Sequence, residues 1–382
     1  MQNVLKNLFA HINTRKFRRK TWRWLLRPLF RAVDATRLDA GELRTSGIHR
    51  ILVLRPNHRL GNLVLITPLL TELEQTFPGA EIDVLTAGES AHEVLANFPS
   101  VRHIRALPHY VARHPLRTLK TIRSLRGARY DLAVSPATDS YSRRVLIYWA
   151  KAPRLIGIPP NDSSGTANWN RILPIAPQHF AMMPVFMLRH TLAAGPGVES
   201  SAYPPLDIRL TADEKTRGRQ TLDAVLATRP AAPGRVPVGI FADASGAKRF
   251  DTSWWLRFLG ALTDAHPEYA IVEFIPVDGR SWLEDRFPSY FSSSLRQFAS
   301  TTACLACFIS ADGGIMHLAS ASGVPTIGMF SVTNPLKYAP YGRHNQACDT
   351  LGKPPEEVAQ AVGDIVETIL NGPEYREIQL TS

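Results

Sequence analysis

The residues best suited to chemistry lie in the stretch FISADGGIMHLASASGVPTIGMFSVTNPLKYAPYG, residues 308–342. A strand is predicted to end at Asp312, two glycines let a ligand approach the backbone, and a helix begins at once. Such a helix start presents unpaired N–H groups and a positive dipole end to an anion, typically a phosphate. The pattern predicts an anion cradle at Asp312, Gly313, Gly314 and His317, although a tight strand–helix corner capped by Asp312 has the same spacing.

A second candidate stretch is FADASGAKRFDTSWW, where a strand ends in small residues. It is expected to bring Ser245, Lys248 and Arg249 to the same sheet edge. A basic side chain facing the start of a helix in the next unit can hold a diphosphate electrostatically. Either basic residue can equally be a solvated loop charge, but Gly246 and Ala247 leave Lys248 uncrowded, which favours a binding role.

The third stretch is ILVLRPNHRLGNLVLITPLL, residues 51–70, in which a buried strand, a polar loop and a helix expected from Asn62 to Phe77 follow one another. This arrangement presents one polar side chain, Asn62, to a ligand, or forms a plain strand–helix corner. A neutral amide cannot take a proton from a hydroxyl as a carboxylate does. The alternative bases are His58 in the loop and Asp139 after the strand DLAVSP. Each also has a purely structural interpretation, His58 as a loop histidine and Asp139 as a helix N-cap.

The elements that must position these residues alternate along the chain. The predicted strands are ILVLRP, EIDVLT, DLAVSP and RLIGI in the first half, and VPVGIFA, YAIVEFIPV, CFISA and PTIGMF in the second. Helices expected between them predict βαβ units and parallel sheets covered on both faces. The proline- and glycine-rich residues 177–237, with one helix at Asp213–Ala227, predict a domain connection.

Length and composition agree with an α/β protein of two domains. A chain of 382 residues is too long for one ordinary core. Its 45% hydrophobic and 20% charged residues are normal for a globular protein. The predicted divisions are a basic arm at 1–46, a Rossmann-like domain at 47–205, a linker at 206–235 and a second Rossmann-like domain at 236–382. Ligands of such folds bind between the carboxyl ends of the strands, here in a central cleft.

The positive charge is concentrated at the start of the chain. Residues 1–40 contain ten basic and two acidic side chains, so they carry +8 of the total +11. Apolar residues recur among the arginines at helical spacing: Trp22, Leu25, Leu26, Leu29, Phe30 and Val33. A basic amphipathic helix with tryptophan predicts attachment to a membrane surface. Nucleic-acid binding would not need the apolar stripe, and the remaining alternative is a helix packed on its own domain.

Several other classes are disfavoured. No run of about 18 uncharged apolar residues and no signal-peptide pattern is present, which disfavours a transmembrane helix and a secretory signal. The small number of cysteines favours a reducing, cytoplasmic setting, and the basic arm predicts a position on the inner face of the membrane. Cys304 and Cys307 form a single C-x-x-C in an apolar stretch without further ligands, so neither a metal nor a redox site is expected. No G-x-G-x-x-G follows a strand, which disfavours a Rossmann oxidoreductase.

Taken in order, the three stretches and the segment YDLAVSPATDSYSRR resemble glycosyltransferase family 9, the ADP-heptose:lipopolysaccharide heptosyltransferases, over residues 48–372. The most specific element is the Asp-x-Gly-x-x-His pattern followed by Gly-Val-Pro-Thr. The resemblance implies a GT-B fold, with the acceptor on the N-terminal domain and the sugar nucleotide on the C-terminal one. It also implies inverting transfer by direct displacement without a metal or cofactor. Lys248 would meet the diphosphate, and the cradle residues would hold the donor.

One position departs from the family pattern. Members usually have Gly-Asp where this chain has Gly61-Asn62, and that aspartate is the favoured base. The resemblance therefore predicts transfer of a heptose or related sugar, from a donor such as ADP-heptose, to a lipopolysaccharide-core or other membrane-associated glycan. The alternative is a weak or inactive relative that binds the sugar nucleotide without turnover. The expected partners are the donor, a lipid-linked glycan and the membrane surface met by residues 1–40, and no nucleic acid.

Overall fold

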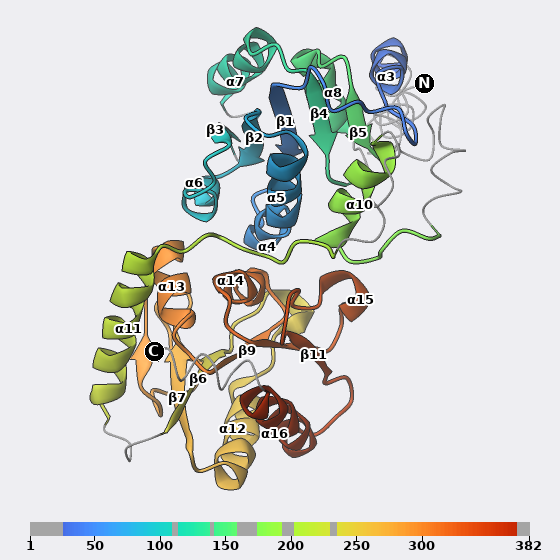
Figure 1. Ribbon diagram of the computed structural model, residues 1–382. Helices are drawn as coiled ribbons and strands as arrows, with labels where there is room; N and C mark the ends of the chain where they lie inside the picture. Colours follow the sequence, from blue (N-terminus) through green and yellow to red (C-terminus); the bar gives the residue numbers. More distant parts are fainter. Residues whose placement is uncertain are drawn as a thin grey trace, which may run out of the picture.

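The computed structural model describes residues 26–108, 114–137, 141–158, 174–192, 202–229 and 235–372. Within these residues the chain forms two α/β domains, one above the other in Figure 1, each built on one parallel sheet. The first sheet has five strands in the order β3-β2-β1-β4-β5, and the second has six in the order β11-β10-β9-β6-β7-β8. The predicted architecture of two parallel-sheet α/β domains is confirmed.

The N-terminal sheet is covered on both faces because its strands are apolar at successive positions. Its strands are β1 (Arg50–Arg55), β2 (Glu81–Ala87), β3 (Val101–Leu107), β4 (Leu132–Ser135) and β5 (Leu155–Gly157). Leu52 and Leu54 face the layer formed by α3 (Arg27–Asp34), α7 (Pro115–Gly127) and α8 (Tyr141–Ala150). Ile51 and Val53 face α4 (Leu60–Val64), α5 (Thr67–Thr76), α6 (Ser90–Val94) and α10 (Met182–Thr191).

The C-terminal sheet is also sandwiched between helices. Its strands are β6 (Val236–Phe241), β7 (Tyr269–Phe274), β8 (Ser289–Tyr290), β9 (Cys307–Ala311), β10 (Thr326–Phe330) and β11 (Gln346–Asp349). One face packs against α12 (Thr252–Ala265) and α16 (Pro355–Asn371). The other face packs against α13 (Leu295–Thr302) and α14 (Gly314–Ser322), and the short α15 (Pro335–Tyr338) follows β10. Cys307 is fully buried as the first residue of β9.

The expected helix from Asn62 to Phe77 is interrupted. It consists of α4 and α5, because Pro68 has no N–H with which to continue the helical ladder to the carbonyl of Val64. The hydroxyl of Thr67 donates to that carbonyl instead, at 2.9 Å. The break leaves α4 as a short separate turn that carries Asn62 toward the other domain.

Part of the predicted membrane arm is core. Phe30 and Val33 of α3 are 5% and 3% exposed, and α3 packs on α8. The guanidinium of Arg144 lies 4.2 Å above the ring of Phe30 and pairs with Asp34. The end of the stripe therefore packs on its own domain, which corrects the membrane assignment for these residues. Residues 1–25, with Trp22 and Leu25, lie outside the described residues.

The predicted linker contains a structural helix of the C-terminal domain. Helix α11 (Ala212–Ala227) packs on α13, and a Cβ at Gly218 would overlap the backbone of Ser300. The connecting segment before it places Leu206 and Ile208 in an apolar cluster that runs from the N-terminal domain into the C-terminal one. The domains therefore share buried apolar surface, which favours a fixed relative orientation.

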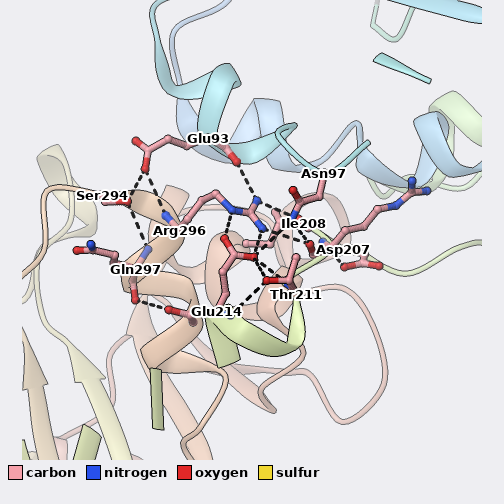
Figure 2. A network of polar contacts seen from close by, with 11 residues as sticks. Glu93, Asn97, Asp207, Ile208, Thr211, Glu214, Ser294, Arg296 and Gln297 are labelled. Atoms are coloured by element: carbon pink, nitrogen blue, oxygen red, sulfur yellow. Dashed lines mark hydrogen bonds and ion pairs between the residues drawn. The ribbon is translucent and has the colours of Figure 1, made fainter. Parts of the chain in front are cut away.

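The domains are joined at the guanidinium of Arg296 in α13, at the centre of Figure 2. Its Nε and Nη2 donate to the carboxylate of Glu214, and the Nη2–Oε2 distance is 2.7 Å. Nη1 donates to the carbonyl oxygens of Glu93 at 3.0 Å and Ile208 at 3.2 Å, and Nη2 to that of Arg209 at 3.2 Å. One side chain thus bonds both domains and the segment between them, and it lowers the pKa of Glu214 to about 2.

The segment between the domains turns at Arg209, whose φ of 53° is in the left-handed region that non-glycine residues rarely adopt. Contacts with the N-terminal domain hold this turn. Asn97 Nδ2 donates to the carbonyl of Arg209 at 2.6 Å, and the Arg209 guanidinium pairs with Glu74 and lies 4.1 Å above the ring of Phe98. The path of the connection is therefore set by both domains.

We expect Arg296→Ala to lower the free energy of unfolding by about 3 kcal/mol, because it removes the guanidinium that pairs with a mostly buried carboxylate and bonds three carbonyl oxygens of both domains and their connection. Arg257→Ala is the matched control, since Arg257 makes a similar two-bond pair with Glu356 on the surface, where both side chains are about half exposed or more. Urea unfolding of both variants measures the difference. Equal effects of the two substitutions would show that Arg296 is not a structural junction.

Candidate functional site

A cavity of about 760 Å³ lies between the two domains, at the carboxyl ends of β6, β7 and β9. The N-terminal domain lines it with residues of α4 and the loop before it: Arg59, Leu60, Gly61, Asn62 and Leu65. The C-terminal domain contributes the turn after β6, the end of β7 and the start of α14. This is the cleft position at which ligands of paired Rossmann-like domains bind.

The first turns of α4 and α14 meet at two glycines on the wall of the cavity. A Cβ built on Gly61 would lie 2.8 Å from Cδ2 of His317 and 3.2 Å from Cα of Gly314. A Cβ on Gly314 would lie 3.0 Å from the backbone nitrogen of Gly61 and from Cβ of Leu60. Only residues without side chains allow this approach, which brings Asn62 opposite the predicted anion cradle.

The start of α14 is open to the cavity. Its N-cap residue, Gly313, is extended, and no side chain among the described residues caps the first N–H groups. Asp312 does not act as the cap. It is 4% exposed, accepts a hydrogen bond from the hydroxyl of Thr333, and has Oδ2 2.7 Å from Nζ of Lys248. The uncapped N–H groups and the ammonium of Lys248 therefore border the same space, as an anionic group requires.

His317 is a neutral group in this wall. It lies in the second turn of α14 and is 3% exposed. Burial lowers the pKa of its imidazole to about 4, against a smaller opposing effect of Asp312. Its Nδ1 has no hydrogen-bond partner among the described residues. His317 is therefore uncharged at neutral pH and adds no positive charge to the cavity.

The side chain of Asn62 is held by a buried arginine. Arg55, the last residue of β1, donates from Nη2 to Asn62 Oδ1 at 2.9 Å and from Nε to the Asn62 carbonyl at 3.0 Å. Burial, followed by the charge of Arg143, lowers the pKa of Arg55 to about 10. Because Oδ1 is occupied as an acceptor, the amide has its NH₂ group left to offer to a ligand.

The structure separates the predicted site residues into two groups. Ser245 and Lys248 line the cavity, as do the four cradle residues and Asn62. Arg249 does not: its guanidinium bonds Asp243 and the Ala244 carbonyl and lies 4.6 Å above the ring of Trp282. His58 is exposed and absent from the lining, with its Cβ near Gly88. Asp139 lies outside the described residues.

Sequence reasoning missed six polar residues of the lining: Arg59, Asp243, Ser292, Ser293, Thr333 and Tyr338. Arg59 and Asp243 lie in the loops that follow β1 and β6, from which other candidate residues had been chosen. Their position after a strand could therefore have predicted that they line the cavity. Thr333 and Tyr338 lie in the connection between β10 and α15 and in α15 itself. No signal in the sequence indicated that this connection would turn toward the cavity. Among the described residues, no group of three or more His, Cys, Asp or Glu side chains is arranged to hold a metal ion.

Comparison with known proteins identifies the class. The chain is similar in fold to a glycosyl transferase of family 9 from Veillonella parvula DSM 2008, with TM-score 0.66 and 17% identity over 86% of this chain and all of that one. It is also similar to E. coli heptosyltransferase WaaC with ADP, with TM-score 0.60 and 18% identity over 84% of this chain and 99% of that one. The fold is therefore of the GT-B type.

One segment of the chain also matches a family model. Residues 292–363 match the model of glycosyltransferase family 9 (heptosyltransferase), which confirms the predicted resemblance to this family. The matched segment contains β9, the whole cradle and α14. A third similar structure is the E. coli ADP-heptose lps heptosyltransferase II, with TM-score 0.57 and 16% identity over 84% of this chain and 99% of that one. No curated protein sequence matches the chain.

We expect Gly61→Ala to destabilise the protein by about 1–3 kcal/mol and to weaken ligand binding, because the added methyl group overlaps His317 and pushes α4 from α14. Gly260→Ala in α12 is the control, since a Cβ there meets nothing within 4 Å. The control should be as stable as the parent or more stable. Thermal unfolding of the two variants measures this, and a harmless Gly61→Ala would contradict the close contact.

We expect Lys248→Ala to weaken ADP binding on the order of 10- to 100-fold, because it removes a charged hydrogen-bond donor from the cavity. Arg249→Ala removes the same charge from the next residue, whose guanidinium does not itself line the cavity and is held by Asp243 and the ring of Trp282. It should weaken ADP binding less than Lys248→Ala does. Calorimetric titration with ADP compares the two, and loss of affinity in Arg249→Ala alone would reverse the assignment.

Proposed function

We propose that the protein is an inverting glycosyltransferase that moves a heptose or related sugar from a nucleotide-diphospho-sugar, such as ADP-heptose, to a membrane-associated glycan of the lipopolysaccharide-core type. The observation that carries the proposal is the uncapped start of α14 beside Lys248 in the cavity between the domains. The family match over this segment and the ADP and ADP-heptose named for structural relatives support the donor class.

In this reaction an acceptor hydroxyl attacks the anomeric carbon, and the bond from that carbon to the diphosphate oxygen breaks. The departing diphosphate gains negative charge. Lys248 and the N–H groups at Gly313 and Gly314 are placed to stabilise that charge without reorganising. Apolar residues at the end of β7, Ile275 and Val277, line the same cavity and offer a surface for the nucleoside base.

The proton of the acceptor hydroxyl must go to a base other than Asn62, whose Oδ1 already accepts from Arg55. The two carboxylates that line the described part of the cavity, Asp243 and Asp312, are both in ion pairs. We therefore retain His58 and Asp139 as candidate bases and assign Asn62 the orientation of the acceptor through its NH₂ group. A general base contributes ~10²–10⁴-fold to the rate.

A second candidate function is binding of the sugar nucleotide without turnover. It is favoured by one observation, the amide at position 62, which is bonded to Arg55 where the family usually has a carboxylate. The cradle and Lys248 are the same in both functions, so nucleotide affinity alone does not distinguish them. Turnover does.

The function is tested by incubating the protein with ADP-heptose and with other sugar nucleotides, in the presence and absence of lipopolysaccharide-core acceptors, and measuring nucleotide release. We expect release that depends on the acceptor and is lost in Lys248→Ala. Binding of the nucleotide with no release under any combination would establish the second candidate. Release without dependence on an acceptor would contradict transfer.

We expect Asn62→Asp to raise the melting temperature at pH 7, because the new carboxylate supplies the counter-charge that buried Arg55 lacks among its described partners. That ion pair depresses the pKa of the carboxylate below its unfolded value of ~3.9, so the gain is present above this pH and is lost as the pH falls further. The same pairing makes the carboxylate a weak base.

The control is Asn97→Asp, which also creates a carboxylate between the domains. The new carboxylate would lie beside the negative charge of Glu214, whereas that of Asn62→Asp lies beside the positive charge of Arg55. It should lower the melting temperature at pH 7. A melting temperature for Asn62→Asp that is unchanged between pH 3 and pH 7 would contradict the charge pairing with Arg55. Restored turnover well above that of the parent would show that position 62 supplies the base.

A further inference from the structure

The outer face of the N-terminal domain exposes apolar side chains beside a row of cations. Five residues of α7 are exposed on one helix face, at spacings of three and four: Leu116, Leu119, Lys120, Arg123 and Arg126. Leu116 is 81% exposed and Leu119 is 42% exposed, whereas Leu125 on the opposite side of the helix is buried in the core. The inner face of α7 therefore packs on the core, while its outer face exposes both leucines and cations to solvent.

Helix α8, which packs beside α7, extends the exposed face with two aromatic rings. Tyr148 is 40% exposed and Trp149 is 37% exposed. The guanidinium of Arg126 lies 5.9 Å from the ring centre of Trp149, which joins the two helices across the surface. These two rings and the five residues of α7 are here called the α7–α8 surface.

The charge of this surface has one sign. Helix α7 contains four basic and no acidic side chains, and α8 contains no acidic side chain either. Helix α3, which packs on the other side of α8, adds the exposed Arg27 and Arg31. In Figure 1 these three helices lie on the N-terminal domain, away from the C-terminal sheet. The exposed cations of α3 and α7 therefore lie on either side of α8, and none of them lines the cavity.

We propose that the α7–α8 surface binds a bilayer with anionic phospholipid headgroups. Exposed leucines can enter the acyl boundary, tyrosine and tryptophan rings favour the interface, and lysine and arginine meet the headgroup phosphates. A nucleic acid would match the charge but not the two leucines, which phosphate contacts do not use. The segment 1–25 contains seven basic and no acidic side chains, so its charge repels this surface and does not suit it as a cover.

The proposal adds a second membrane contact, on the folded N-terminal domain, to the one that the sequence predicts for residues 1–40. It rests on the proposed function in one respect, since a membrane-associated acceptor gives the surface its purpose. Because α3 joins residues 1–25 to the same helical layer, both attachments would hold the protein from one side. The cavity between the domains would then keep a set orientation to the bilayer.

The test is sedimentation of the full chain with vesicles of phosphatidylglycerol and phosphatidylcholine in equal parts, and with pure phosphatidylcholine vesicles. Each interfacial cation contributes a roughly five-fold factor, so Lys120→Glu/Arg123→Glu should lower the partition coefficient by at least ~25-fold. Leu116→Gln/Leu119→Gln should lower it without changing net charge. The control is Lys215→Glu/Arg219→Glu, an equal charge reversal on exposed residues of α11, which should bind as the parent does.

Calorimetric ADP binding by the same variants separates this proposal from the proposed function. Variants of α7 that bind ADP as the parent does but no longer bind vesicles support the membrane proposal. A parent protein that binds vesicles but not ADP would contradict the proposed function of the cavity and leave the membrane proposal standing. The proposal is overturned if the α7 variants bind vesicles as tightly as the parent, or if the parent binds neither vesicle. It is also overturned if the α7 variants lose only binding to a nucleic-acid homopolymer, or only self-association of the protein.

Discussion

The structure depends on the contact between the first turns of α4 and α14, where Gly61 and Gly314 leave no room for a side chain. This contact brings the N-terminal domain to the open helix start of the C-terminal one. The cavity, the position of Asn62 and the burial of His317 all follow from it. A looser contact would expose the cradle to water and weaken every electrostatic interaction within it.

Two further features hold that contact in place. The apolar cluster that continues through Leu206 and Ile208 gives the domains a common core, and the guanidinium of Arg296 bonds both domains and the segment between them (Figure 2). Since the pKa of Glu214 is lowered to about 2, this junction stays charged at any pH at which the protein is expected to work. The cavity is therefore held by groups that take no part in its chemistry.

The sequence predicted the fold and the C-terminal half of the site because both depend on local order. A strand, two glycines and a helix place Asp312, Gly313, Gly314 and His317 together whatever surrounds them. Contacts between distant segments were not predictable in this way. The pattern could not show that Asp312 would pair with Lys248 rather than cap α14, or that the short helical turn before Arg249 would direct this side chain away from the cavity. Nor does an apolar stripe distinguish a membrane from a core, as α3 shows.

The central claim is that the open start of α14 and Lys248 hold the diphosphate of a sugar nucleotide. A crystal structure of the protein with ADP, or with an unreactive fluorinated ADP-sugar, tests it most directly. The account predicts phosphate oxygens within hydrogen-bond distance of the N–H groups at Gly313 and Gly314, with the ammonium of Lys248 beside them and the sugar turned toward Asn62. A nucleotide bound elsewhere while the start of α14 stays free would contradict the account.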